Sequence, residues 1–368
     1  MKRGIATLPL HRGRAPAWLF QRMVRMAREI ALVMAERYGP AHLLERLADP
    51  FWFQAFGCFL GFDWHSSGLT TTVCGALKEG LRGLNKELDL FVAGGKGRTS
   101  RQTPGEIASA CQLIGADAKP LIYASRMAAK VDSSALQDGY RIYHHCFLFT
   151  QDGHWAVVQQ GMNEDTGLAR RYHWFSEIVP DFVVEPHAAI CCDQRGPVLN
   201  LVARESETTR SKIAQLSRES PDRLIKEIKK GKALELPSRH HISLADLNEG
   251  KLASIFLKTY EKQPADFQAV LATAGVGAKT IRALTLLSEL LFGATPSPRD
   301  PARFSFAHGG KDGHPYPVDR DTYERTIRIL HNCARAARLG RSEKLEGLRR
   351  LSLFYPGVPD SPLNGQEA

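Results

Sequence analysis

A short segment at residues 275–280 has the composition of a turn that binds phosphate. It reads Gly275-Val276-Gly277-Ala278-Lys279-Thr280 and lies between two stretches with helical spacing of apolar residues. Glycine permits positive φ and removes the Cβ atom where the backbone closely approaches a partner. The helix that follows presents backbone N–H groups and the positive end of its dipole, which suits a phosphate. The segment therefore predicts an element that binds one DNA strand through its phosphates without reading bases, with Val276 packed between the helices.

This segment resembles the helix-hairpin-helix element of DNA repair proteins, especially the base-excision glycosylases of the endonuclease III type. In bifunctional members of that family, the lysine at the position of Lys279 attacks the sugar C1′ and forms a Schiff base. The family also places an aspartate just ahead of the next helix, which Asp319 matches, with Asp321 as the alternative. The resemblance implies a DNA repair glycosylase with AP-lyase activity. In it, Lys279 is the nucleophile, Asp319 stabilises the developing positive charge, and Gly275, Val276, Gly277 and Thr280 bind DNA.

The resemblance to glycosylases covers the C-terminal third of the chain. Only Cys333 lies downstream of the hairpin, so an iron–sulfur cluster is not expected and no cofactor is implied. The whole chain also resembles a prokaryotic family catalogued as a domain of unknown function. The residues that carry this second resemblance are the blocks 62–68 and 307–316. It implies no mechanism.

An aromatic block at residues 51–64 could form the pocket for a base that has left the DNA stack, as base excision requires. The candidate residues of this base pocket are Trp52, Gln54, Asp63 and Trp64. The amide or the carboxylate would pair with a base edge. Packing into the hydrophobic core is the competing interpretation.

Two glycine loops carry basic or basic-capable side chains that could contact phosphates. The first includes Lys96 and Arg98, and the second includes His308, Lys311 and His314. A solvated turn is the alternative for both loops. The position of the second loop, just after the hairpin helices, favours the phosphate interpretation there.

Two further functions stay open. Histidine and cysteine recur between residues 144 and 192, but no spacing among them matches a structural zinc site, so no metal is expected. Asp132, Asp138 and Glu185 could nevertheless hold magnesium in a metal-dependent, structure-selective nuclease that uses the hairpin as an anchor. A non-catalytic DNA-binding accessory protein of repair or recombination is the third possibility.

The composition is that of a soluble globular chain, with 43% hydrophobic and 24% charged residues among 368. No apolar run approaches the ~18 residues of a membrane span. The net charge of +10 favours a polyanionic partner, and DNA is the expected one. The 7 cysteines include no Cys-x-x-Cys, and the N-terminus has no apolar signal region. A reducing cytoplasm, in association with the nucleoid, is therefore expected.

The predicted fold class is α+β. Two strand-like runs at 140–150 and 154–160 flank an Asp-Gly turn, which is a strong signal for a β-hairpin. From residue 243 onward the apolar spacing is helical. The expected organisation is an α+β domain with a small antiparallel sheet at 1–202, a charged helical linker at 203–240, an all-helical helix-hairpin-helix domain at 241–356, and a flexible tail at 357–368.

Overall fold

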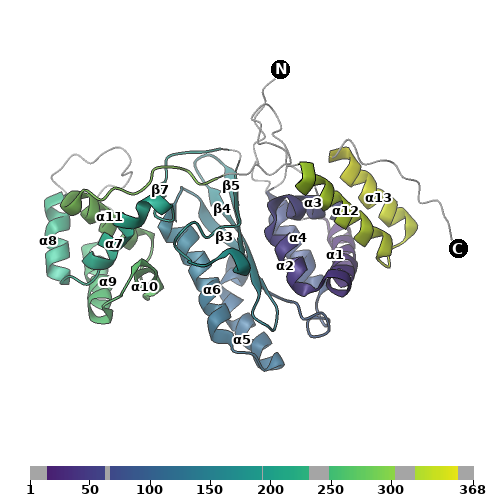
Figure 1. Cartoon of the computed structure of the whole chain (residues 1–368), viewed down its shortest axis with the longest axis horizontal. Helices are drawn as coiled ribbons and strands as arrows, with labels where there is room; N and C mark the ends of the chain where they lie inside the picture. Colours follow the sequence, from purple (N-terminus) through teal and green to yellow (C-terminus); the bar gives the residue numbers. More distant parts are fainter. Residues whose placement is uncertain (1–14, 63–66, 193, 232–247, 303–319, 355–368) are drawn as a thin grey trace, which may run out of the picture.

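The computed structural model describes residues 15–62, 67–192, 194–231, 248–302 and 320–354. Its helices form two groups that flank a central antiparallel sheet (Figure 1). One group contains α1–α4 together with α12 and α13, and the other contains α5–α11. The chain is therefore α+β with a small antiparallel sheet, as the sequence predicts.

The central sheet has the strand order β1-β3-β4-β5-β6, and every neighbouring pair is antiparallel. The strands are β1 (Phe91–Lys96), β3 (Arg141–Phe149), β4 (Trp155–Asn163), β5 (Leu168–Phe175) and β6 (Ala189–Cys191). A tight turn with Gly153 at φ +95° joins β3 to β4, so the predicted β-hairpin is confirmed. A second small sheet pairs β2 (Leu136–Gln137) with β7 (Leu199–Asn200).

The first helical group covers one face of the sheet. Its members are α1 (Ala17–Tyr38), α2 (Pro40–Ala48), α3 (Pro50–Leu60), α4 (Gly68–Gly80), α12 (Arg320–Ala336) and α13 (Arg341–Phe354). The α3 helix begins where the Asp49 carboxylate accepts hydrogen bonds from the amides of Phe51 and Trp52, and it ends at Gly61 with φ +109°. The apolar residues of this group share one core with Cys146 and Val158 of the sheet.

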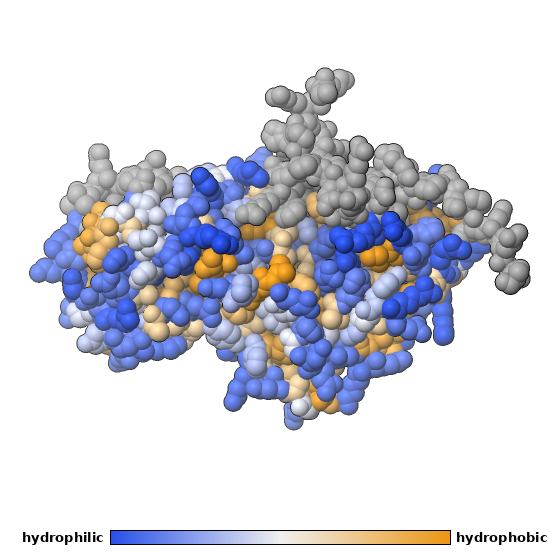
Figure 2. All heavy atoms as spheres, in the orientation of Figure 1, coloured by the Kyte–Doolittle hydropathy of each residue, from blue (hydrophilic) through white to orange (hydrophobic). Residues whose placement is uncertain are grey.

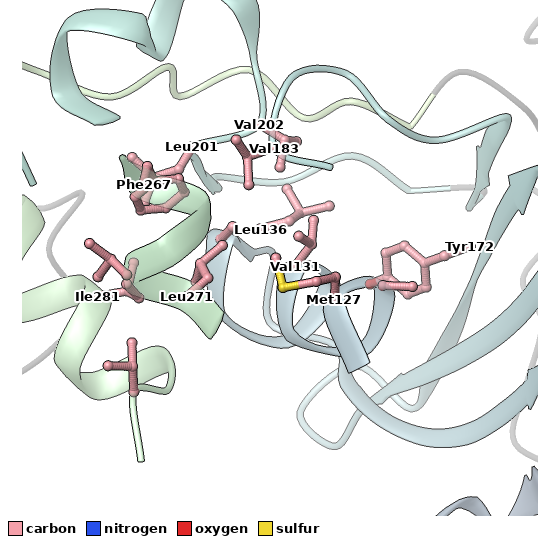
Figure 3. Close-up of a cluster of buried hydrophobic side chains, with 14 of the residues drawn as sticks. Met127, Val131, Leu136, Tyr172, Val183, Leu201, Val202, Phe267, Leu271 and Ile281 are labelled. Atoms are coloured by element: carbon pink, nitrogen blue, oxygen red, sulfur yellow. The ribbon is translucent and has the colours of Figure 1, made fainter. Parts of the chain in front are cut away.

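The second helical group covers the other face and extends away from the sheet. Its α-helices are α5 (Thr103–Ile114), α6 (Ala118–Lys130), α7 (Glu207–Leu216), α8 (Pro221–Gly231), α9 (Glu249–Lys262), α10 (Phe267–Ala272) and α11 (Ala278–Phe292). Shorter helical turns are η1 (Gly97–Gln102), η2 (Val131–Ala135), η3 (Ser176–Ile178) and η4 (Arg204–Ser206). Figure 3 shows the continuous core in which Val131 and Leu136 approach Leu271 and Ile281.

The structure divides the chain differently from the expected domains. The α7 and α8 helices of the expected linker bury Ile213, Leu224 and Ile228 in the same core as α10 and α11. The α12 and α13 helices, expected to join that lobe, pack instead against α1 and α3 (Figure 1). The physical reason is the apolar stripe of α12, because Leu330, Cys333 and other residues of that stripe enter the core of the first group. The expected tail at 357–368 lies outside the described residues.

Ion pairs hold α13 onto α1 across the length of the chain. Arg22 pairs with Glu346 at 2.5 Å, and Arg25 pairs with Glu343. Cys333 of α12 also lies 3.2 Å from the sulfur of Met34. The C-terminal helices therefore complete the N-terminal helical layer.

Candidate nucleic-acid interface

The Gly275–Gly277 segment forms a turn between α10 and α11. Gly275 has φ +89° and is exposed, whereas Val276 is 4% exposed and belongs to the core that Leu271 and Ile281 share. The positive φ explains the glycine at position 275, because a side chain is strained in that conformation. The short helix and the longer helix are joined by this turn, whose exposed tip is at Ala274 and Gly275.

The start of α11 differs from the starts of the two helices before it. Asn248 and Asp266 cap α9 and α10 by accepting hydrogen bonds from backbone amides of their first turns. At α11 the capping position is Gly277, which has no side chain to accept such a bond. The first turn of α11 therefore offers its amides and the positive end of its dipole to an outside acceptor.

Lys279 is exposed in the first turn of α11, directly after the Gly277 cap. Thr280, which was expected to contact DNA, is 2% exposed and faces the core. The difference follows from helical spacing, because residue 280 lies on the same side of the helix as the buried Leu284. Among the expected contacts, the structure thus brings Gly275, Gly277 and Lys279 together on one accessible edge.

The turn is tied to the central sheet unit by Lys130 at the end of α6. Its ammonium donates hydrogen bonds to the carbonyl oxygens of Leu271 at 2.5 Å, Thr273 at 2.8 Å and Val276 at 3.2 Å. These carbonyls belong to the end of α10 and the turn, where helical partners are missing. Burial lowers the pKa of Lys130, and the positive charge of Lys262 lowers it further. No sequence motif marks this lysine.

A second tie connects the start of α11 to β2. The Gln137 amide donates to the carbonyl oxygen of Ala278 at 3.0 Å and accepts from the Arg282 guanidinium at 2.7 Å. Burial lowers the pKa of Arg282. Gln137 and Lys130 together fix both ends of the turn relative to the sheet.

The carboxylate partner expected for Lys279 does not belong to a described site. Asp319 and the alternative Asp321 carry no described side chain, since residues 303–319 and the side chains of 320–324 lie outside the described set. The helix that starts directly after Asp319 is α12, which packs on the opposite face of the sheet from α11 (Figure 1). His308, Lys311 and His314 also lie outside the described residues.

The structure places two of the expected base-pocket residues in the core of the first helical group. Trp52 is 0% exposed and stacks on Phe56 with ring centroids 4.8 Å apart. The Gln54 amide oxygen accepts from the buried guanidinium of Arg171 at 3.0 Å. Neither side chain presents an open edge to a base, so core packing, the competing interpretation, holds for both. Asp63 and Trp64 lie outside the described residues.

The first glycine loop is surface-exposed, and Lys96 and Arg98 extend from it. Its fold depends on Gly94, with φ +88°, because a Cβ atom there would lie 2.2 Å from the carbonyl oxygen of His145. The Glu106 carboxylate accepts from the Gly94 amide at 2.7 Å and pairs with Lys78. The loop is therefore held firmly while its basic side chains face solvent.

The carboxylates considered for a magnesium site belong to separate networks. Asp132 is 0% exposed and lies close to the donor nitrogens of Gln159, Trp174 and His187 at 2.5, 2.9 and 2.5 Å. Asp138 is an ion-pair partner of Arg170. Within the described ranges, no group of three or more histidine, cysteine or acidic side chains is arranged to hold a metal.

The partners of the Asp138–Arg170 pair show a structural role. The Arg170 guanidinium lies 3.0 Å from Asp138 and 2.7 Å from Asp300, and the Tyr172 hydroxyl donates to Asp138 at 2.7 Å. Burial raises the pKa of Asp138, while Arg170 opposes the rise. Glu185 pairs with Arg204 at the surface. Arg170 thus anchors the segment after α11 to the sheet.

Sequence reasoning missed the polar side chains that line both faces of the sheet near one end. Arg170 and Arg171 are each 1% exposed although they are adjacent in one strand, so they point to opposite faces. The sequence does contain a sign of these buried networks, because Arg170 and Arg171 are consecutive in a strand-like run. If such a strand is buried, each guanidinium needs a hydrogen-bond or ion-pair partner. His145 also joins such a network, since it lies 2.8 Å from Ser125 and 2.7 Å from Gln159.

The visible surface is mostly hydrophilic, and its apolar residues form separate patches (Figure 2). None of the described helices is long and apolar enough to cross a membrane. Ala274, Gly275 and Lys279 of the α10–α11 turn are exposed.

The arrangement defines an α+β protein in which two helices joined by a glycine turn, α10 and α11, pack against η2, which follows α6 beside the antiparallel sheet. The chain belongs to the family described as "Protein of unknown function (DUF763)", whose model matches residues 4–318. This match confirms the resemblance of the whole chain to a family of unknown function. No curated protein and no solved structure matches the chain.

Proposed function

We propose that this protein binds DNA through the α10–α11 turn and acts as a DNA repair glycosylase with AP-lyase activity. The observation that supports the proposal best is the exposed Lys279 in the first turn of α11, beside a glycine cap and a glycine turn. Amides at a helix start bind a phosphate, and a nearby lysine adds charge. The proposed partner is lesion-containing duplex DNA, and the proposed location is the nucleoid of the cytoplasm.

In the proposed chemistry, the Lys279 amine attacks C1′ of the damaged nucleotide. The bond between C1′ and the base breaks, and the base leaves with one proton of the amine. The C1′–O4′ bond of the sugar then opens, the second amine proton passes to O4′, and the lysine is joined to the sugar as a Schiff base. A carboxylate would stabilise the positive charge that develops on the sugar, and Asp319 is the proposed residue. Ties from Lys130 and Gln137 would keep the lysine aligned with the phosphates that the turn binds.

The second candidate is a non-catalytic DNA-binding accessory protein of repair or recombination. The position of α12 favours it, because the helix following Asp319 packs on the face of the sheet opposite α11. In that case Lys279 is a phosphate contact only. Nothing in the described geometry favours the nuclease, since Asp132 and Asp138 are both engaged by buried donors.

Borohydride cross-linking tests the proposal. The full chain is incubated with duplexes carrying uracil, an oxidised pyrimidine, 8-oxoguanine or an abasic site, and borohydride reduces any Schiff base to a stable adduct. The matched variants are Lys279→Gln and Lys226→Gln, because Lys226 is an exposed lysine on α8 and the charge change is the same.

Glycosylase–lyase activity predicts an adduct that Lys279→Gln abolishes and Lys226→Gln preserves. Salt-dependent DNA binding without any adduct supports the accessory protein, and Lys279→Gln should then lower the salt slope by about one. The absence of DNA binding by the parent chain would contradict both candidates.

A further inference from the structure

A row of polar side chains crosses the sheet on the face covered by the first helical group. Strand register places Lys96 opposite His144, His144 opposite Gln160, and Gln160 opposite Arg171. Side chains opposite each other on neighbouring strands point to the same face, about 4.8 Å apart. We refer to Lys96, His144 and Gln160 as the polar row. It runs from exposed Lys96 at the rim to buried Gln160 inside.

Two buried members of the polar row have polar atoms that no described residue satisfies. His144 is 1% exposed, and neither of its ring nitrogens has a hydrogen-bond partner within the described chain. The amide oxygen of Gln160, which is 0% exposed, is likewise without one. A buried polar atom without a partner costs about 1–3 kcal/mol. Two such side chains side by side therefore point to an occupant that the protein itself does not supply.

The orientation of the Gln160 amide is fixed by its other contacts. Its nitrogen donates to the carbonyl oxygen of Ser67 at 2.8 Å and to the Tyr143 hydroxyl at 2.5 Å. The Ser67 carbonyl can only accept, so the nitrogen must face it, and the amide oxygen is the atom left without a partner in the described chain. The occupant must therefore donate a hydrogen bond to the Gln160 oxygen.

His144 further restricts the hydrogen-bonding groups that the occupant can have. Burial lowers its pKa to about 3, and the nearby charges of His145 and Lys96 act in the same direction. The ring is neutral at pH 7, so one nitrogen donates and the other accepts. Inorganic phosphate or sulfate supplies acceptors almost exclusively and leaves the Gln160 oxygen unsatisfied. A planar group with adjacent donors and acceptors satisfies both side chains.

The exposed end of the row supplies positive charge. The Lys96 ammonium lies 5.8 Å from the centre of the Tyr143 ring, and Arg98 extends from the same glycine loop. A ligand that reaches inward to Gln160 would therefore leave its outer part beside Lys96, where an anionic group is favoured. Donor–acceptor edges inside and an anion at the rim are the features of a nucleotide.

We propose that the polar row binds a nucleobase that carries a phosphate, with the base edge against His144 and Gln160 and the phosphate at Lys96. The nucleotide can be free or can be turned out of a DNA strand. Only the second source rests on the proposed function.

The first arm of the test uses free nucleotides and the full chain. Binding of each 5′-nucleoside monophosphate is measured by titration calorimetry against ribose 5-phosphate and inorganic phosphate. We expect at least one nucleotide to bind tenfold or more tightly than ribose 5-phosphate. Lys96→Ala should weaken its binding about tenfold, which corresponds to the loss of one charge-assisted contact. Lys119→Ala, at an exposed lysine on α6, should leave it unchanged.

Gln160→Leu removes the inner acceptor and should abolish the preference for the nucleotide over ribose 5-phosphate. If this buried variant fails to fold by circular dichroism, the exposed Lys96→Ala variant alone decides the matter. The second arm compares duplexes with one bulged nucleotide and with a bulged abasic site. If the chain binds the duplex with the bulged nucleotide more tightly than the duplex with the bulged abasic site, and Lys96→Ala reduces this difference in affinity, the nucleotide that the polar row binds is one turned out of a DNA strand.

The two proposals fail separately. Lys279→Gln should weaken duplex binding and leave free-nucleotide binding unchanged, because Lys279 belongs to the other helical group. If neither free nucleotides nor bulged bases are distinguished from their base-free controls, ordered water fills the row and this inference is overturned while the proposed function stands. If nucleotides bind but the parent does not bind duplex DNA, the proposed function fails and the nucleotide site stands.

Discussion

The Nζ atom of Lys130 lies 2.8 Å from the carbonyl oxygen of Thr273, although 143 positions separate the two residues. The same ammonium also reaches the carbonyl oxygens of Leu271 and Val276. A side chain of the sheet-bound helix α6 therefore satisfies the end of α10 and the turn that carries Gly275. This contact joins the turn, which is the proposed DNA-binding element, to the helix that packs on the sheet.

Replacing Lys130 with methionine should destabilise the protein and weaken DNA binding together. The variant keeps most of the apolar stem but leaves the three carbonyl oxygens without their donor, at a cost of about 1–3 kcal/mol. Urea unfolding and a duplex-binding titration measure the two effects. Lys119→Met, at an exposed lysine near the start of α6, is the matched control. Unchanged stability in Lys130→Met would show that water replaces the ammonium without loss.

The two glycines of the turn should respond differently to alanine. Gly275 has φ +89°, and its added Cβ would meet only an ordinary contact with Ile255 at 3.5 Å. The cost of Gly275→Ala is therefore conformational, about 1–2 kcal/mol. Thermal or urea unfolding should detect it, and restoring a glycine-like conformation with Gly275→Asn should recover part of the loss. Equal stability of Gly275→Ala and the parent would contradict the positive φ.

Gly277→Ala should instead act on binding. Gly277 is extended, with φ −147°, and no atom of the described chain lies within 4 Å of the position of its Cβ. Stability should fall by less than about 1 kcal/mol, the cost of alanine at a helix cap. If the proposed DNA binding holds, duplex affinity should fall more, because the new methyl group stands where the phosphate is proposed to approach the first amides of α11. A variant that binds DNA like the parent would remove this turn from the interface.

The sequence predicts the parts of the fold that depend on neighbouring residues. The β3–β4 hairpin follows from alternating apolar residues around Asp152-Gly153, and the α10–α11 turn follows from two glycines between helical patterns. The contacts that join distant segments are absent from such patterns. Gln54 pairs with Arg171 across 117 positions, which removes it from any base pocket.

The placement of α12 likewise depends on contacts between distant segments, which sequence patterns do not predict. Its apolar spacing predicts a helix with a buried stripe, but a stripe of this kind fits either helical group. Only the three-dimensional structure shows that Cys333 lies against Met34 of α1. The aspartate taken from the glycosylase resemblance was located by sequence order, which says nothing about the face of the sheet on which the following helix packs.

Asp132 provides a test between a structural carboxylate and a metal ligand. Asp132→Asn would turn an amide nitrogen toward donors on Gln159, Trp174 or His187, so it should cost about 1–3 kcal/mol. Thermal unfolding with EDTA and with magnesium should give the same midpoint for the parent, because its carboxylate is already occupied by donors. A magnesium-dependent rise in the midpoint that Asp132→Asn abolishes would instead support the nuclease.

His144 should make the protein sensitive to acid in a direction that its burial fixes. Its pKa in the folded state is lowered to about 3, from an ordinary value of 6.5, because the buried ring resists protonation. Between these values the unfolded chain binds a proton that the folded chain does not. The free energy of unfolding therefore falls as the pH is lowered below 6.5, by up to about 1.4 kcal/mol per pH unit for this histidine.

Burial also lowers the pKa values of His145 and His173, so these histidines add to the effect in the same direction. Replacing His144 with glutamine should remove the contribution of His144 to the pH dependence of the free energy of unfolding. The contributions of His145 and His173 should remain. Urea unfolding of the parent and the His144→Gln variant at pH 7, 6 and 5 measures the difference. Since glutamine does not titrate in this range, the parent should lose more stability than the variant as the pH falls. Parallel curves would mean that the folded protein protonates His144, which requires an acceptor that the buried ring lacks within the described chain.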